Sequence, residues 1–230
     1  MYLAAFPPCK QELARGTRYL VERCRRASVH IQLNMAAESG QIAGEGWDAV
    51  VVASGGHPAM PAFLQGANNL TSAWDVLAGR ICPGQNVVIV GGGLVGCETA
   101  DFLLPPIQDL ASRSRRVALL EQGNTVGAEE RSAFRPLLVQ RLIQKGCEIH
   151  TGARVISVAG DTMQYEQDGN LHTVAGVDTV ISAVGTRPES ELASELKALG
   201  IPAVVIGDAA GAGTILAATQ GGWETAQRLP

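Results

Sequence analysis

The chain has 230 residues, of which 46% are hydrophobic and 17% charged, and a formal net charge of −4. This composition is typical of a globular protein, and it gives no electrostatic reason to expect nucleic acid or an anionic membrane as partner. No apolar run reaches the roughly 20 residues of a membrane helix and no signal peptide is evident, so we expect a cytoplasmic location. The 5 cysteines form no CxxC pair, which argues against a metal site or a redox dithiol.

The first third of the chain predicts a helix, two strands and a loop. Apolar residues at helical spacing predict a helix over 11–26. VHIQL (29–33) predicts a short strand, and WDAVVVASGG (47–56) predicts a strand too continuously apolar to face water on either side. Pro58, Pro61 and the GANN cluster then indicate a loop, followed by one or two helical turns in SAWDVLAG.

From Asn86 onward, strands and helices alternate regularly. NVVIV, RVALLE, CEIHT, ARVISVAG and VDTVISAVG predict strands, and LVGCETADFLL and ERSAFRPLLVQRLIQKG predict helices. TMQYEQ and LHTVA predict a hairpin because Asp-Gly between them favours a tight turn. The chain then predicts a helix (SELASELKALG), a strand (AVVIGDA) and a closing helix (TILAATQGGWETAQRL). We therefore expect an α/β fold, with a Rossmann-like parallel sheet and a small antiparallel insert, set into a partial FAD-binding domain.

A glycine motif in VVIVGGGLVGCETA predicts dinucleotide binding. Its G-x-G-x-x-G pattern falls on Gly91, Gly93 and Gly96, directly after an apolar strand and at the start of a helix. Gly91 would allow the tight turn, Gly93 the close approach of a pyrophosphate, and Gly96 the packing of helix against strand. The helix N-terminus would attract the phosphates. The predicted cradle is completed by Gly92, Leu94 and Val95.

An acidic residue, Glu121, ends the next predicted strand, where an acid binds the ribose hydroxyls of a dinucleotide. It comes 25 residues after Gly96, because PPIQDLASRS forms an insertion after the prolines end the helix. A carboxylate here repels a 2′-phosphate, and Gln122 is not a basic clamp. Arg115 and Arg116 lie at the other end of the strand. We therefore expect NAD(H) to be preferred over NADP(H).

Two strands share an ending, DAVVVASGG and DTVISAVGTRP, and VVIGDAAGAGTILAATQGG places an Asp at the end of a third. With LAAFPPCKQEL and the glycine motif, this order resembles the C-terminal FAD/NAD(P)-binding region of the 2,4-dienoyl-CoA reductase and trimethylamine dehydrogenase (NADH:flavin oxidoreductase) family, over nearly the whole chain. That family belongs to the two-dinucleotide-binding flavoprotein superfamily, which includes the disulfide reductases. The resemblance implies a nicotinamide contact at Ala183, Val184 and Gly185, and an FAD contact at Ala53, Ser54, Gly55, Gly207, Asp208 and Ile215.

The resemblance also implies how the chain is divided. A partial FAD-type domain would cover 1–74, an NAD(H)-binding Rossmann-like domain 75–185, and a segment returning to the FAD-type domain 186–230. The family's FAD domain begins with its own strand, glycine motif and helix, and nothing of that kind precedes Asn86. We therefore expect a fragment, truncated at the N-terminus, that is not competent without the missing FAD motif. Its partners would be the missing flavin domains, and open strand edges would permit a homodimer.

In the intact parent, hydride would pass from NADH to FAD, so the chain would be part of an NADH:flavin oxidoreductase. No general acid, base or nucleophile is expected in the chain, because the cofactors carry this chemistry. Two alternatives remain open. One is a non-catalytic NAD-binding module, and the other is a dithiol-type reductase of the same superfamily, against which the lack of a cysteine pair counts. The final electron acceptor would bind outside the chain.

Overall fold

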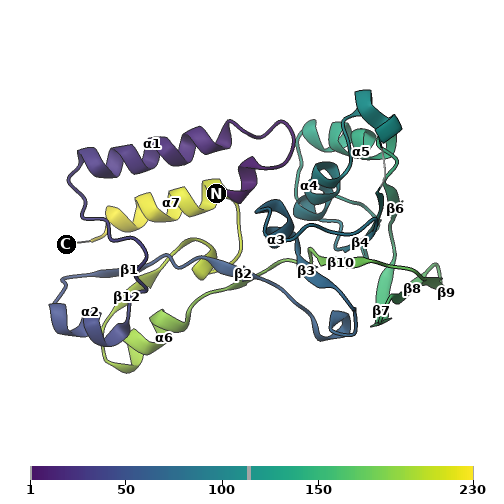
Figure 1. The fold of residues 1–230 in the computed structure, drawn as a ribbon. Coiled ribbons are helices and arrows are strands. Elements are labelled where there is room, and N and C mark those ends of the chain that lie inside the picture. The colour runs from purple at the N-terminus through teal and green to yellow at the C-terminus, as the bar shows by residue number, and fades with distance from the viewer. Residues whose placement is uncertain (1, 113–114, 230) are drawn as a thin grey trace. The chain divides into compact units, whose positions relative to one another are not determined.

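The computed structural model describes residues 2–112 and 115–229 and is drawn in Figure 1. The chain divides into two compact units. Unit 1 consists of 1–18 and 58–185, and unit 2 of 19–57 and 186–230. Unit 1 is built on a five-stranded parallel sheet in the order β3-β10-β4-β5-β6. Its strands are β3 (Leu70–Ser72), β4 (Asn86–Val90), β5 (Arg116–Leu120), β6 (Glu148–His150) and β10 (Thr179–Ser182).

This sheet is covered on both faces. One face packs against the helices α3 (Ala73–Leu77), α4 (Leu94–Leu103) and α5 (Phe134–Gln144). The other packs against an antiparallel sheet made of β7 (Arg154–Ala159), β8 (Thr162–Gln167) and β9 (Asn170–Val174), and against the short helix η2 (Ala62–Leu64). Side chains alternate along β4, so Val87 and Ile89 face the helices while Val88 and Val90 face the antiparallel sheet. Burial on both faces explains why this strand is continuously apolar.

The predicted fold class is confirmed. NVVIV and RVALLE are neighbouring parallel strands, and the stretch from 154 to 174 forms the antiparallel insert. The hairpin turn lies at Asp168 and Gly169, whose φ angles are +52° and +75°. Because both residues are in the left-handed region, the turn has the geometry that Asp-Gly favours. Unit 1 also contains the short helices η1 (Leu3–Ala5) and η3 (Ile107–Ser112), the second of which follows the prolines that end α4.

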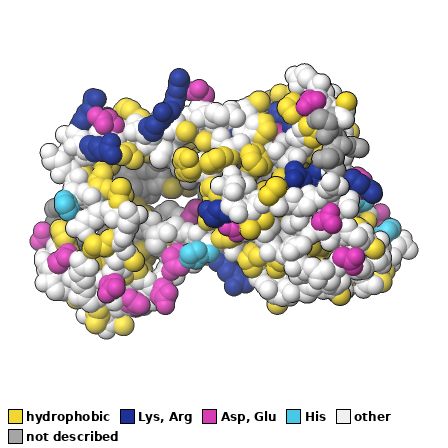
Figure 2. Space-filling view, viewed as in Figure 1, with side chains coloured by type: hydrophobic (Ala, Val, Ile, Leu, Met, Phe, Trp, Pro, Cys, Tyr) yellow, Lys and Arg dark blue, Asp and Glu magenta, His cyan; other side chains and the backbone are white. Residues whose placement is uncertain are grey.

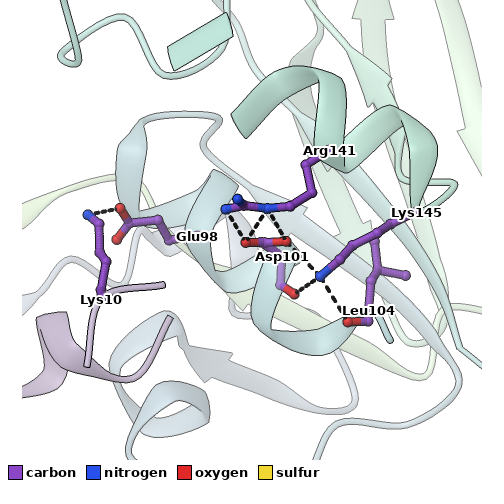
Figure 3. A network of polar contacts seen from close by, with 6 residues as sticks. All are labelled: Lys10, Glu98, Asp101, Leu104, Arg141 and Lys145. Atoms are coloured by element: carbon purple, nitrogen blue, oxygen red, sulfur yellow. Dashed lines mark hydrogen bonds and ion pairs between the residues drawn. The ribbon is translucent and has the colours of Figure 1, made fainter. Parts of the chain in front are cut away.

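A buried ion cluster joins α4 to α5 (Figure 3). The carboxylate of Asp101, 1% exposed, accepts hydrogen bonds from Arg141 Nε at 3.1 and 3.0 Å and from an Arg141 terminal nitrogen at 2.6 Å. Lys145 Nζ lies 2.7 Å from Asp101 Oδ1 and donates to the carbonyl oxygens of Asp101 and Leu104. The hydrogen bonds from Arg141 to the Asp101 carboxylate raise the pKa of Arg141. The cluster holds the C-terminal end of α4 against α5.

Unit 2 has a smaller sheet. Its strands β1 (Val50–Val52) and β12 (Ala203–Val205) pair in parallel, with Val52 opposite Val205. β2 (Gly56–Pro58) pairs with β11 (Thr186–Pro188). The helices are α1 (Leu13–Arg26), which begins in unit 1, α2 (Ser39–Glu45), α6 (Glu191–Ala198), η4 (Gly207–Ala209) and α7 (Ile215–Ala226). In the space-filling view of the whole chain, hydrophobic side chains are interspersed with basic and acidic ones over the visible face (Figure 2).

Two sequence-based expectations for unit 2 are corrected, and one helix was not predicted. Residues 29–33 form no strand and are exposed, since no neighbouring strand pairs with them. The strand in 47–56 was expected to be buried on both faces, but it is only three residues long and Val51 is 39% exposed. Its sheet has one other strand, β12. Helix α2 was not predicted, because its sequence SGQIAGE contains two glycines, which are poor helix formers.

Candidate functional site

The strand order of unit 1 reverses between β4 and β10. From β4 the chain proceeds outward to β5 and then β6, and it returns to β10 on the opposite side of β4. In open parallel sheets of this kind, ligands bind outside the carboxyl ends of the strands at the point of reversal. Gly91 follows β4 and Ala183 follows β10, so both predicted binding segments begin at this point. The Ala183 N–H donates to the Val90 carbonyl at 2.8 Å.

The glycine turn has no room for side chains. Gly91 has a φ of +103°, and a Cβ added there would lie 2.5 Å from the Ala183 carbonyl oxygen. A Cβ on Gly96 would overlap the Gly91 carbonyl oxygen, so the first turn of α4 packs directly on the strand exit. Gly93 is the N-cap of α4, in extended conformation. Gly93 therefore places no side chain of its own over the N-terminus of α4, as a phosphate cradle requires.

The structure brings the predicted ribose-binding acid to this turn. The carboxylate of Glu121 accepts hydrogen bonds from the N–H groups of Gly92 and Gly123, both at 2.6 Å. Beyond Gly123 lies an open hollow of about 420 Å³, lined by Gln122, Gly123, Gly152, Arg154, Glu166, Asp168 and Gly169. Arg154 is paired with Glu166 at 2.7 Å. Arg154 was not predicted as a residue near the site, because it lies 33 positions after Glu121 in the sequence.

The remaining predicted residues of unit 1 lie beside the same turn. Ala183, Val184 and Gly185 follow β10, and Val184 is partly exposed. Gly185 has a φ of +110°, and its carbonyl oxygen accepts a hydrogen bond from the Ala59 N–H at 2.9 Å. Val95, on the first turn of α4, is also exposed. The residues predicted to hold the pyridine nucleotide are thus gathered at the carboxyl ends of three adjacent strands.

An ion pair on the cradle helix was not predicted. Lys10 donates to the carboxylate of Glu98, which is buried on α4, and the ammonium group lies 5.6 Å from the centre of the Phe134 ring. Burial raises the pKa of Glu98, although Lys10 opposes the shift. The pair could not be recognised in the sequence because its partners are 88 positions apart. The available signal was one acid within the otherwise apolar start of the helix, LVGCETA.

The residues predicted to border FAD lie together within unit 2. Ala53, Ser54 and Gly55 follow β1, while Gly207 and Asp208 follow its parallel neighbour β12. Ile215 opens α7. Three hydrogen bonds hold the segments that follow these strands. The Ile206 N–H donates to the Val52 carbonyl oxygen at 3.0 Å, and Ser54 Oγ donates to the Glu189 carbonyl oxygen at 2.5 Å. The Gly213 N–H donates to Asp208 Oδ1 at 3.0 Å. His57 Nε2 lies 2.5 Å from Glu189 Oε2 and lowers the pKa of that carboxyl.

The cysteines lie apart from these groups. Cys97 and Cys147 are buried in the helical core of unit 1, and burial raises the pKa of each thiol to about 12. Cys9, Cys24 and Cys82 are exposed, and all five thiols are free. Across residues 2–112 and 115–229, no cluster of His, Cys, Asp and Glu is arranged to hold a metal ion. Within the same residues no helix has the length and apolarity to cross a membrane.

Comparison with known proteins assigns the fold to a family. The profile described as pyridine nucleotide-disulphide oxidoreductase matches residues 20–210. A bilirubin reductase from Mediterraneibacter gnavus is 30% identical over 90% of this chain and 31% of its own length. An NADH oxidase from Thermoanaerobacter brockii is 28% identical over 99% of this chain and 35% of its own. The solved complex of 2-naphthoyl-CoA reductase with 2-naphthoyl-CoA has the same fold, with a TM-score of 0.83 at 24% identity over 96% of this chain and 33% of that one. The chain spans about a third of the length of these relatives.

Proposed function

The chain belongs to the pyridine nucleotide-disulphide oxidoreductase family of flavin-dependent oxidoreductases, and we propose that its unit 1 binds NAD(H) at the carboxyl ends of β4, β5 and β10. The observation that carries this proposal is the meeting of the Gly91 turn, the Glu121 carboxylate and Ala183 at the reversal of strand order. The turn fits a dinucleotide because Gly93 has no side chain that would keep a phosphate from the N-terminus of a ten-residue helix.

Each group would hold a different part of the nucleotide. The amides of Gly93 and Leu94 would bind the pyrophosphate. Glu121, whose carboxylate already accepts a hydrogen bond from the Gly92 N–H, would also accept hydrogen bonds from the hydroxyls of the adenosine ribose. The segment 183–185 would lie along the nicotinamide half. In this proposal an NAD(H)-binding domain covers 75–185 and an FAD-type domain covers 1–74 and 186–230, while the compact unit 1 also includes 1–18 and 58–74.

We further propose that unit 2 contributes to an FAD site in a longer protein. Ala53–Gly55, Gly207 and Asp208 would border the flavin, with Asp208 accepting a hydrogen bond from its ribityl chain and Ile215 facing the ring. The chain has one G-x-G-x-x-G turn, which the pyridine nucleotide uses, so the FAD pyrophosphate would need a segment outside this sequence. The relatives, about three times as long, support this reading. Within this family, we propose that the chain belongs to the 2,4-dienoyl-CoA reductase and trimethylamine dehydrogenase group.

When bound, the nicotinamide and flavin supply the hydride chemistry. The residues of this chain would bind and orient the two nucleotides. Lys10 and Glu98 form a charged pair on the helix that begins at the cradle, and their mutual attraction fixes the Lys10 segment to α4. No residue of the chain is assigned a proton transfer, which agrees with a step that moves hydride between two cofactors.

The proposal is tested by NADH titration calorimetry on Gly93→Val. Because Gly93 has ordinary backbone angles and the atom nearest to the new Cβ is the end of the exposed Glu129 side chain, which can move, the variant should fold. Its side chain would then fill the space over the helix N-terminus. We expect NADH affinity to fall at least about tenfold, or about 1.4 kcal/mol. Gly40→Val is the matched control, since a Cβ there meets nothing within 4 Å. Equal affinity of Gly93→Val and the control would refute the cradle.

The preference for NADH over NADPH is proposed from Glu121, whose carboxylate would repel a 2′-phosphate. The name of the NADH oxidase relative supports this direction. In Glu121→Ala the ratio of the two affinities should move toward unity, because the repulsive charge and the acceptor for the ribose hydroxyls are both removed. An unaltered ratio in the same calorimetric titrations would refute the role of Glu121.

A further inference from the structure

A carboxylate already occupies the helix N-terminus at the proposed pyrophosphate position. Glu129 belongs to the loop between β5 and α5, and its Oε2 accepts a hydrogen bond from the Leu94 N–H at 3.0 Å. Leu94 is the first residue of α4, so its amide is one of those that the helix leaves without an intrahelical acceptor. The donor that the glycine motif would offer to a phosphate oxygen is therefore bonded to an oxygen of the chain itself.

The same carboxylate fills the space that Gly93 leaves open. A Cβ added to Gly93 would lie 2.6 Å from Glu129 Oε1 and 3.3 Å from the carboxyl carbon. This is the space that a pyrophosphate needs, because the missing side chain is what allows the phosphate to approach the backbone. Glu129 also acts on the cradle helix electrostatically. Burial is the main cause of the raised pKa of Cys97, and the negative charge of Glu129 is the next largest cause.

We infer that Glu129 is a built-in competitor of the dinucleotide, whose carboxylate holds the α4 N-terminus in the free protein and withdraws when a diphosphate binds. The inference rests on the proposed function, because it takes the pyrophosphate site as given. A carboxylate and a phosphate carry like charges and need the same amide, so both cannot occupy it. Glu129 is exposed, so its side chain can turn into solvent without a change in the core.

The alternative role for Glu129 is that of an ordinary helix cap. Acidic side chains near a helix N-terminus stabilise the helix, and this contact does so as well. The two roles predict different effects of removing the carboxylate. Loss of a cap lowers the stability of the free protein and leaves the affinity for NADH unchanged. Loss of a competitor lowers that stability and also raises the affinity, because the ligand no longer displaces an internal hydrogen bond.

The test compares wild type, Glu129→Gln and Glu129→Ala at one ionic strength, using NADH and inorganic pyrophosphate as separate probes in titration calorimetry. Glu130→Gln is the matched control, since the Glu130 carboxylate bonds the Ser132 N–H within its own loop. A hydrogen bond to a charged group is stronger than a neutral one but is weakened by exposure, so both Glu129 variants should bind either probe about tenfold more tightly. The midpoint temperature of the free protein should fall in both.

Each outcome of these titrations either supports or refutes the competitor role of Glu129. Tighter binding of NADH and pyrophosphate by both Glu129 variants, with Glu130→Gln like wild type, supports the inference. If wild type binds NADH and the Glu129 variants bind it equally or more weakly, the competitor role is refuted and the proposed function stands. If no version of the chain binds NADH, the proposed function fails and the inference fails with it. Amide exchange at Leu94 gives an independent readout, because its protection in the free protein should be lost in Glu129→Ala and restored by pyrophosphate.

Discussion

Replacing Asp101 by Asn should destabilise unit 1 more than any exposed charge substitution. The Asp101 carboxylate is buried and accepts three hydrogen bonds from Arg141, and Lys145 Nζ lies 2.7 Å away. The amide keeps one acceptor oxygen but no charge, so two cations, one of them 4% exposed, lose their counterion. Breaking a buried pair in this way costs about 3–5 kcal/mol, and the residual hydrogen bond places Asn at the lower end.

The assay is equilibrium unfolding in urea, followed by far-ultraviolet circular dichroism. A loss of about 3 kcal/mol with a slope near 2 kcal/mol/M lowers the midpoint by roughly 1.5 M. Glu148→Gln is the control, because the pair between Arg116 and Glu148 is exposed on both sides and should contribute at most about 1 kcal/mol. If Asp101→Asn lost no more stability than this control, the cluster could not be the buried ionic link between α4 and α5.

Three further predictions concern the nucleotide site. Gly96→Val should cost about 3 kcal/mol or more in the same unfolding assay, because its Cβ overlaps the Gly91 carbonyl; wild-type stability would contradict the close packing. Because the pKa of Glu98 is raised in the native state, the native state binds more protons than the unfolded chain, and stability falls as pH rises from about the ordinary value of 4.5 to the raised native value. Glu98→Gln should remove this fall in unfolding curves measured from pH 4.5 upward. Glu166→Gln frees Arg154 beside the hollow and should raise NADPH affinity about fivefold in calorimetry without changing that for NADH, a gain that Arg154→Ala in the same chain should cancel.

Local signals were sufficient to predict the parallel sheet of unit 1 and the glycine turn that follows β4. The apolar run 86–90 is continuous because both faces of β4 are covered, and Gly91 and Gly96 are glycines because a Cβ would meet backbone atoms. The hairpin turn at 168–169 was predicted for a similar reason, since its residues adopt positive φ angles. In each case the physical cause acts over a few neighbouring residues and leaves a pattern in the sequence.

The features that sequence analysis missed depend on distant partners. β2, β3 and β11 have three residues each, too few to show a period. Residues 29–33 have the composition of a strand but no strand to pair with. The Lys10–Glu98 pair and the contact of Glu129 with Leu94 join residues that are 88 and 35 positions apart. Only the folded chain brings such partners together, so one sequence without its relatives cannot reveal them.

The most direct test of the nucleotide site is hydrogen–deuterium exchange on the purified chain with and without NADH. If NADH binds at this turn, we expect new protection in peptides covering residues 91–96, 121–123 and 183–185, at the carboxyl ends of β4, β5 and β10. Peptides from α2, which lies in unit 2 and carries no proposed contact, should exchange at an unchanged rate. Protection confined to other segments, or none at saturating NADH, would contradict the claim that this turn binds the dinucleotide.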